Sequence, residues 1–237
     1  MTVVVWRTEW LTALRRRRLF LLNTLIPLAF VATIAFSPAP AVHSAAVFTV
    51  LFTLFGTFGS SIPLIRDGES GLLRRYILTG VHPAVLLFQH IFATAAIDLI
   101  QLTPSIFVLA IARGSSAAQL AMVAPAMVLG MIAANTLGTI TAAVAKSVAE
   151  GALFSAVAAL VLLHLSGAFR TPAPGTWQAV LEAWSPFRPL HESLLAATGA
   201  GGPDLETALL TLPIAATLAV LLLVAASGRH AAGLGGR

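Results

Sequence analysis

The sequence contains no cysteine and few charged side chains. Of its 237 residues, only 10% are Asp, Glu, Lys or Arg, whereas soluble domains carry about 25%. The absence of cysteine excludes a disulfide framework, a thiolate metal site and a thiol nucleophile. The shortage of charge leaves too little polar surface to cover a globule, so we expect lipid to cover much of the exterior.

The usual sequence features of nucleotide and nucleic-acid binding are also missing. There is no GxxxxGKS or GxxxxGKT loop to cradle phosphates, and the single lysine, Lys146, does not follow a glycine-rich stretch. The arginines lie at the edges of apolar runs and form no single basic face, so we expect no nucleic-acid partner. We predict that the chain is not an enzyme and has no catalytic residue, metal or cofactor. Any ATP hydrolysis should occur on another polypeptide.

The chain does contain long apolar runs. A transmembrane helix needs about 20 mainly apolar residues, and six runs meet this requirement. They cover residues 19–36, 45–65, 83–112, 120–145, 151–169 and 205–226. We therefore predict an all-α, polytopic membrane protein with six spans, organised as a single transmembrane domain over residues 1–237.

The positive charges are divided unevenly between the two sides of these spans. Eleven of the fourteen Lys and Arg residues fall in one alternating set of connecting segments, and only Arg113, Arg170 and Arg188 fall in the other. Short cytoplasmic loops hold an excess of Lys and Arg. The distribution predicts a multi-pass protein of the plasma (inner) membrane with both termini in the cytoplasm.

Residues 1–18 have a helical pattern of their own before the first span. The apolar stripe is made of Val3, Trp6, Trp10, Ala13 and Leu14. Because indole rings favour the headgroup region and arginines bind anionic lipid, the pattern predicts an interfacial helix that lies flat on the membrane. The alternative is a frayed basic tail, and the two tryptophans four residues apart favour the helix.

Polar residues follow one face of the third predicted span. His90, Thr94, Asp98, Gln101 and Ser105 are spaced by 4, 4, 3 and 4 residues, which stacks them along one side of a helix. A carboxylate near midspan is costly in lipid, so this face should contact protein or a wet cavity. Asp98 is then either a counter-charge for a cationic substrate or a proton carrier, or else a buried acid that bonds to Gln101 and a neighbouring helix. The sequence leaves both readings open.

Hydroxyl-bearing and small residues recur in the second and fourth predicted spans. The second has Thr49, Thr53, Thr57 and Ser60 on one face, and the fourth has Asn135 and Thr139 one turn apart. Such residues allow close helix packing in lipid, so we expect most of these stripes to be helix contacts. Some could line a path for an amphipathic substrate. The candidates for that path are Thr53, Thr57, Asp98, Gln101, Asn135 and Thr139.

Residues 170–204 form an outer segment that is too long for a turn and too polar for a span. Its apolar stripe consists of Trp177, Val180, Leu181 and Trp184. The stripe predicts short re-entrant or interfacial helices between the fifth and sixth spans. His191 and Glu192 lack the ligand spacing of a zinc site, so we expect them on a solvated rim.

A short charged segment, residues 66–80, separates the second and third predicted spans. Its charged residues are Arg66, Asp67, Glu69, Arg74 and Arg75, and its apolar stripe is Leu72, Leu73, Tyr76 and Ile77. The pattern predicts a short cytoplasmic amphipathic helix that fits a groove on a partner. The alternative is a loop anchored to lipid headgroups, and an anionic surface would repel Asp67 and Glu69.

This segment resembles the coupling loop of the type-two ABC export permeases. That family has six spans, a cytoplasmic "elbow" helix first, and then, after the second span, an acidic residue, a glycine, a short coupling helix and a proline-bearing entry to the third span. The matching residues here are Glu69, Ser70, Gly71, Leu72, Leu73, Tyr76, Ile77, Leu78, Thr79, Gly80 and Pro83. Gly80, Val81 and His82 depart from the pattern, because relatives often have a threonine and proline pair sooner. The outer stretch LSGAFRTPAPGTWQAVLEAWSPFRPL is also similar to the family.

The resemblance implies a permease subunit that docks a cytoplasmic ATP-binding subunit, on which ATP and Mg bind. It also implies pairing with a second permease copy or a homologous permease. The residues it assigns to ATPase coupling are Asp67, Glu69, Gly71, Leu72, Leu73, Arg74 and Tyr76. The expected activity is export of an amphipathic or hydrophobic substrate such as a drug, antibiotic, peptide or lipid.

Two other classes of function stay open on the sequence. The first is an ion-coupled secondary transporter in which Asp98 and His90 form the proton site. The second is an integral membrane enzyme that uses His164, His191 and Glu192 as acid and base near the outer face. No recognisable catalytic spacing supports the second class.

Overall fold

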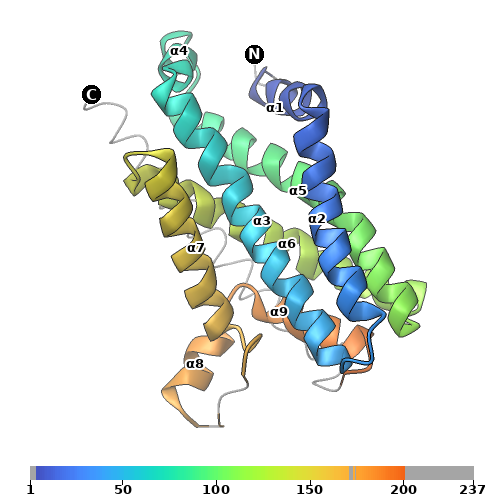
Figure 1. Cartoon of the computed structure of the whole chain (residues 1–237). Helices are drawn as coiled ribbons and strands as arrows, with labels where there is room; N and C mark the ends of the chain where they lie inside the picture. The colour runs from blue at the N-terminus through green and yellow to red at the C-terminus, as the bar shows by residue number, and fades with distance from the viewer. Residues whose placement is uncertain (1–3, 171–172, 174, 201–237) are drawn as a thin grey trace.

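The structure is a computed structural model that describes residues 4–170, 173 and 175–200. Within these residues it contains nine α-helices and no strand (Figure 1). The helices are α1 (Val4–Arg15), α2 (Arg17–Ala35), α3 (Ala41–Glu69), α4 (Leu72–Leu78), α5 (Pro83–Arg113), α6 (Ala117–Val144), α7 (Val148–Leu165), α8 (Trp177–Ala183) and α9 (Arg188–Ala197). The long helices lie along one another as a bundle, which confirms the predicted all-α membrane fold.

Five of these helices, α2, α3, α5, α6 and α7, are long and apolar enough to cross a membrane. They coincide with the first five predicted spans, and the sixth, 205–226, lies outside the described residues. The boundaries differ from the prediction by up to four residues, and the C-terminal ends of α3 and α7 have a clear physical reason. α3 continues past residue 65 to Glu69, because helical hydrogen bonding does not require apolar side chains and the chain leaves the helix only near Gly71, at φ 73°. α7 ends at Leu165 rather than 169, just before Gly167 at φ 79°.

The two ends of the bundle carry different short helices. α1 and α4 lie at one end, at the top of Figure 1, and α8 lies at the other. α9 lies at the same end as α8. α5 begins beside α4 and ends at the opposite end of the bundle, in the turn to α6, and Ser115 in that turn donates to the Ala197 carbonyl of α9 at 2.7 Å. We refer below to the α1/α4 end and the α8/α9 end.

A helix, α1, lies where the interfacial helix over residues 1–18 was predicted, and a backbone break at Arg16 separates it from α2; its position at the membrane surface stays a prediction. Part of the predicted apolar stripe faces outward, since Trp6 and Leu14 are 38% and 55% exposed. Val5 is buried and belongs to an apolar cluster that also contains residues of α3, α4, α5 and α6. α1 is therefore attached to the bundle and also presents an apolar surface to its surroundings.

The centre of the bundle is α3, which runs between α2 and α7 in Figure 1. Its close contact with α6 depends on glycines, which have no side chain. A Cβ atom on Gly56 would lie 2.7 Å from both Ala134 Cβ and Met131 Sδ, and one on Gly138 would overlap the Thr57 carbonyl oxygen. Lipid tails are as apolar as the side chains they contact, so the hydrophobic effect does not drive membrane helices together. Close van der Waals packing of this kind holds them together instead.

A large apolar cluster lies between the α3–α6 glycine contact and the α8/α9 end. It contains Phe48 and Phe52 from α3, Leu102 from α5, Met131 from α6 and Leu190 from α9. Phe48, Phe52, Met131 and Leu190 are completely inaccessible, and Leu102 is nearly so. α9 therefore closes the bundle at this end.

The Gly138 contact leads to a stability prediction. Alanine normally stabilises a helix by about 0.5–1 kcal/mol relative to glycine, but at Gly138 its methyl group would collide with the backbone of α3. We expect Gly138→Ala to lower the free energy of unfolding by about 1–3 kcal/mol, the usual range for overpacking. The measurement is thermal unfolding of the purified protein in detergent.

Gly68→Ala is the matched control. Gly68 also lies in α3, but a Cβ there would find only Leu73 Cδ1, at 3.8 Å. Its melting temperature should equal or exceed that of the wild type. Equal behaviour of the two variants would contradict the close α3–α6 contact.

Candidate functional site

A cavity of about 770 Å³ lies between α1, α2, α3 and α5. This volume is within the range of about 300–1,000 Å³ typical of small-molecule sites. Its walls include Phe20 from α2, Phe55, Phe58 and Ile62 from α3, and Ile97 from α5. The cavity is therefore largely apolar and can surround a hydrocarbon or aromatic body.

The cavity extends from the α1/α4 end to the middle of the bundle. Near that end it is lined by Glu9, Arg16, Arg66 and Asp67. Its inner limit is marked by Asp98, which is the midpoint of α5, and by Gln101 in the following turn. The cavity therefore has charged residues at its α1/α4 end and hydrogen-bond acceptors at its inner limit, halfway along the bundle.

Asp98 is held in place by two neighbouring helices. Asn135 on α6 donates from Nδ2 to Asp98 Oδ2 at 3.1 Å. On α3, Gly59 faces the carboxylate so closely that an added Cβ would lie 2.9 Å from Asp98 Oδ1. The buried polar face predicted from the spacing is confirmed, since His90, Asp98 and Gln101 are all less than 7% exposed.

Of the six predicted path residues, the cavity is lined by two, Asp98 and Gln101. The other four are completely buried where α3 and α6 meet. Thr53 and Thr57 donate to carbonyls one turn earlier in α3, at 2.9 and 2.7 Å. Thr139 forms a 2.9 Å contact with the Ser60 hydroxyl. This geometry gives these threonines, with Asn135, a packing and positioning role.

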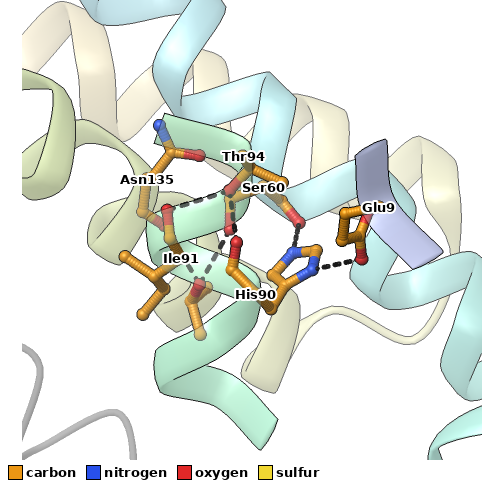
Figure 2. A network of polar contacts seen from close by, with 7 residues as sticks. Glu9, Ser60, His90, Ile91, Thr94 and Asn135 are labelled. Carbon is orange, nitrogen blue, oxygen red and sulfur yellow. Dashed lines mark hydrogen bonds and ion pairs between the residues drawn. The ribbon is translucent and has the colours of Figure 1, made fainter. Parts of the chain in front are cut away.

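A second polar network lies beside the cavity and connects α1 to α5. Glu9 Oε1 is 2.9 Å from His90 Nδ1, and His90 Nε2 is 3.2 Å from the Ser60 carbonyl (Figure 2). Because an ionised Glu9 carboxylate and the Ser60 carbonyl both accept hydrogen bonds, His90 satisfies the two together with a proton on each ring nitrogen. The geometry therefore describes a buried ion pair that attaches α1 to the bundle.

The role of Glu9 was missed by the sequence analysis, which placed α1 flat on the membrane. Its side chain is only 16% exposed and lines the cavity as well as pairing with His90. The available signal was that Glu9 is the only acid in an otherwise basic segment. An acid there is repelled by anionic lipid and needs a cation elsewhere.

The ion pair predicts how firmly α1 is attached. Glu9→Ala removes the partner of a buried charge, a change that typically costs about 3–5 kcal/mol, so α1 should detach more often. Trypsin cleavage at Arg15, Arg16, Arg17 and Arg18 reports this, and we expect at least a severalfold faster cut between α1 and α2. Glu9→Gln keeps an acceptor for His90 and should be cut at an intermediate rate. Wild-type rates for Glu9→Ala would mean that the pair does not hold α1.

The corner between α3 and α4 is formed by two residues, Ser70 and Gly71. Gly71 has φ 73°, where a side chain would be strained, so the glycine allows the chain to turn here. Glu69, Ser70, Arg74 and Arg75 are exposed around this corner. Asp67 instead turns toward the cavity, which it lines.

Part of the apolar stripe of α4 packs against the bundle. Leu73 is 6% exposed and packs with Leu64 of α3 and Leu86 of α5, and Leu72 lines the cavity. Tyr76 and Ile77 of the same stripe are half-buried. Leu73 is therefore not available to a partner, and docking of the rest of the stripe in a groove on a partner stays a prediction. The face of the corner that is left free is polar, apart from Leu78, which is 76% exposed.

A comparison with protein families connects this corner and bundle to a known architecture. A family model described as ABC-2 type transporter matches residues 2–198, most of the chain. The chain belongs to the ABC-2 type transporter family. A comparison with curated protein sequences gives no match. The protein is accordingly an integral membrane permease subunit of an ABC transporter, and membership implies an ATP-binding partner.

At the α8/α9 end of this ABC-2 permease, the two short helices behave differently. The stripe of α8 is exposed, with Trp177, Val180, Leu181 and Trp184 between 42% and 68% accessible. α9 is buried against α3 and α6, and its His191 and Glu192 are 4% and 8% exposed. The expected solvated rim is wrong for these two residues. The apolar stripe of residues 177–184 carries no information on how residues 188–197 pack against α3 and α6.

Arg188 joins α8 to α9 in the ABC-2 permease. Its Nε lies 2.7 Å from Glu192 Oε1 and 3.9 Å from Glu182 Oε1. Burial raises the pKa of Glu182, and the Arg188 guanidinium opposes that rise. His191 contacts Thr49 Oγ1 through Nδ1 at 3.3 Å, and burial lowers its pKa from 6.5 to about 4. His191 is therefore neutral in the folded protein at pH 7.

The lowered pKa of His191 makes the fold sensitive to acid. Between pH 6.5 and 4 the unfolded chain protonates His191 and the folded chain does not, so stability falls as the pH falls through this window. We expect the loss attributable to His191 to be about 2 kcal/mol between pH 7 and pH 5. His191→Gln should flatten that part of the pH dependence in thermal unfolding.

His43→Gln is the control, because His43 is exposed near the start of α3 at the same end. It should keep the wild-type pH dependence. If His191→Gln and wild type lose stability in parallel from pH 7 to 5, His191 is not the group responsible.

Proposed function

We propose that this ABC-2 permease is the transmembrane subunit of an ATP-driven exporter that moves an amphipathic or hydrophobic substrate out of the cell. ATP and Mg act on a separate cytoplasmic ABC ATPase. The permease functions as a dimer with a second copy or a homologous permease. The single observation that supports this most is the α3–α4 corner, because it combines an exposed charged tip with a direct connection to the cavity wall.

The position of Glu69 at this corner does not stabilise the fold. It lies in the last turn of α3, where the negative end of the helix dipole disfavours an acid by about 0.3–1 kcal/mol. It is exposed, and in the part of the chain that the structure describes no ion pair involves it. An exposed acid kept at an unfavourable position fits recognition of a basic surface on a partner, and we assign it to the ATPase.

Force applied at the corner reaches the cavity through α3. The same helix supplies Leu54, Phe58, Ile62 and Asp67 to the cavity lining. Because Ser70 and Gly71 leave no flexible linker between α3 and α4, displacement of the corner moves α3 as a body. We take the α1/α4 end as cytoplasmic. ATP-driven closure of the partner ATPase would then close the cavity at this end and open it toward the outside of the cell.

Apolar surface remains for lipid and for the second permease. On α2, Leu21, Leu25 and Phe30 are 53% to 58% exposed, and on α7, Leu153 and Val157 are 60% and 52% exposed. Both helices lie at the outside of the bundle in Figure 1. A permease partner and the bilayer would divide these faces between them.

The ion-coupled alternative finds less support in the geometry. It needs His90 to exchange protons with Asp98, but both His90 ring nitrogens are directed to Glu9 and the Ser60 carbonyl. Asp98 is bonded to Asn135. The two groups that this alternative requires therefore belong to separate networks.

Charge reversal at Glu69 tests the proposal. Tagged permease is solubilised from its native membranes, and the retained ATPase is quantified by ATP hydrolysis and mass spectrometry. Wild type should retain an ATP-hydrolysing chain. Glu69→Arg should retain at least about tenfold less, since reversing one contact charge costs about 1.4 kcal/mol or more.

Lys146→Glu is the matched reversal, at an exposed position between α6 and α7. It should retain the ATPase at the wild-type level. The proposal fails if wild type retains no ATPase, or if Glu69→Arg retains as much as Lys146→Glu does.

A further inference from the structure

The inner part of the cavity presents hydrogen-bond acceptors without matching donors. Among the described residues, Gln101 Oε1 is buried and has no hydrogen-bond partner, and Gln101 is 4% exposed. Asp98 accepts from Asn135, but within residues 4–170, 173 and 175–200 no ion pair involves its carboxylate. Both side chains line the cavity. A buried carboxylate with no cation is an expensive arrangement unless something else supplies the charge.

Two prolines add backbone acceptors to the same cavity. Pro27 lies inside α2 and Pro63 lies inside α3. Proline has no N–H, so the carbonyls of Asn23 and Gly59, one turn earlier, lack the helical hydrogen bond that another residue would donate. Asn23 and Gly59 both line the cavity, and Gly59 lies directly against Asp98. Acceptors therefore come from α2, α3 and α5.

The surroundings of these acceptors are aromatic and aliphatic. Phe20, Phe55 and Phe58 line the cavity together with Leu54 and Ile97. Phenyl faces attract cations as well as apolar groups. The two arginines of the lining, Arg16 and Arg66, are near the α1/α4 end and not beside Asp98. The charge of His90, two turns from Asp98 on α5, is paired with Glu9. Positive charge on a ligand is therefore favoured at the inner limit of the cavity.

We propose that this cavity binds an amphiphile with an ammonium group, with the ammonium between Asp98 and Gln101 and the apolar body along Phe55 and Phe58. An ammonium offers several N–H donors, which suits a carboxylate with no ion pair, an amide oxygen without a partner and two carbonyls that lack their usual helical donor. This inference rests on the proposed function and narrows its substrate class to cations. Anionic amphiphiles are disfavoured because they would place a second negative charge beside Asp98.

Binding of a matched pair of fluorescent probes tests the inference without any ATPase. Dansylcadaverine carries a free ammonium on an apolar fluorophore, and its N-acetyl derivative is neutral. Both are titrated into the full-length permease in nanodiscs of phosphatidylcholine and phosphatidylglycerol, with empty nanodiscs subtracted. The wild type should bind the ammonium probe at least about tenfold more tightly than the neutral one.

Three variants identify the groups responsible. Asp98→Asn should bring the preference for the ammonium probe close to onefold, and Gln101→Leu should reduce it about threefold, both with little change for the neutral probe. Ser105→Ala is the control, because Ser105 lies on the same buried face of α5 and its Oγ lacks a partner among the described residues, yet it does not line the cavity. It should keep the wild-type preference. Gln101→Leu provides the test if Asp98→Asn does not fold.

A further arm separates a lipid headgroup from a soluble amine. Phosphatidylethanolamine added to the nanodiscs should weaken dansylcadaverine binding to wild type, but not to Asp98→Asn, if the ammonium comes from lipid. Unchanged binding would indicate a soluble amine. Either result keeps ammonium recognition at Asp98. Equal affinity of wild type for the two probes, or a preference that survives Asp98→Asn, overturns the inference. ATPase capture at Glu69 would be unaffected, so the two proposals fail independently.

Discussion

The close approach of α3 to α5 and α6 is the constraint on which the rest of the structure depends. It exists because glycines stand where the helices meet, with Gly138 against the Thr57 backbone and Gly59 against the Asp98 carboxylate. In lipid there is no water to release from apolar side chains, so contact area and satisfied polar groups decide how helices associate. A side chain at either glycine would separate the helices that position Asp98 and form the inner limit of the cavity.

Local periodicity in the sequence was enough to predict the five spans that the described residues contain and the buried polar face. The spacing of His90, Asp98 and Gln101 places them on one side of any helix, and an acid at midspan excludes lipid from that side. The spacing does not say which helix covers which part of that face. Asp98 and Gln101 reach the cavity, whereas Thr53 and Thr57 are covered by α6. This division depends on how neighbouring helices are arranged, which no single segment specifies.

The short helices were harder to predict because their apolar stripes have three possible partners. For α4 the pattern fits a groove on another protein equally well, yet Leu73 packs within the bundle. For α8 the stripe stays exposed, and for α9 burial includes His191 and Glu192. In each case amphipathicity predicts a helix that lies against something apolar. The sequence does not distinguish lipid, another subunit and the chain itself.

One helix, α3, contributes to the corner, to the cavity wall and to the environment of Asp98. α3 carries Glu69 at its end, Ile62 and Asp67 in the cavity lining and Gly59 against the Asp98 carboxylate. Because added atoms at Gly59 would already collide with Asp98, α3 has no room to move toward α5 and can shift only by sliding or tilting away. A partner that acts on the corner would therefore change the space beside the buried acid in the same movement. Coupling of an external event to ligand affinity would then need no further element, since the proposed ligand at Asp98 and the proposed partner at Glu69 would both depend on the position of α3.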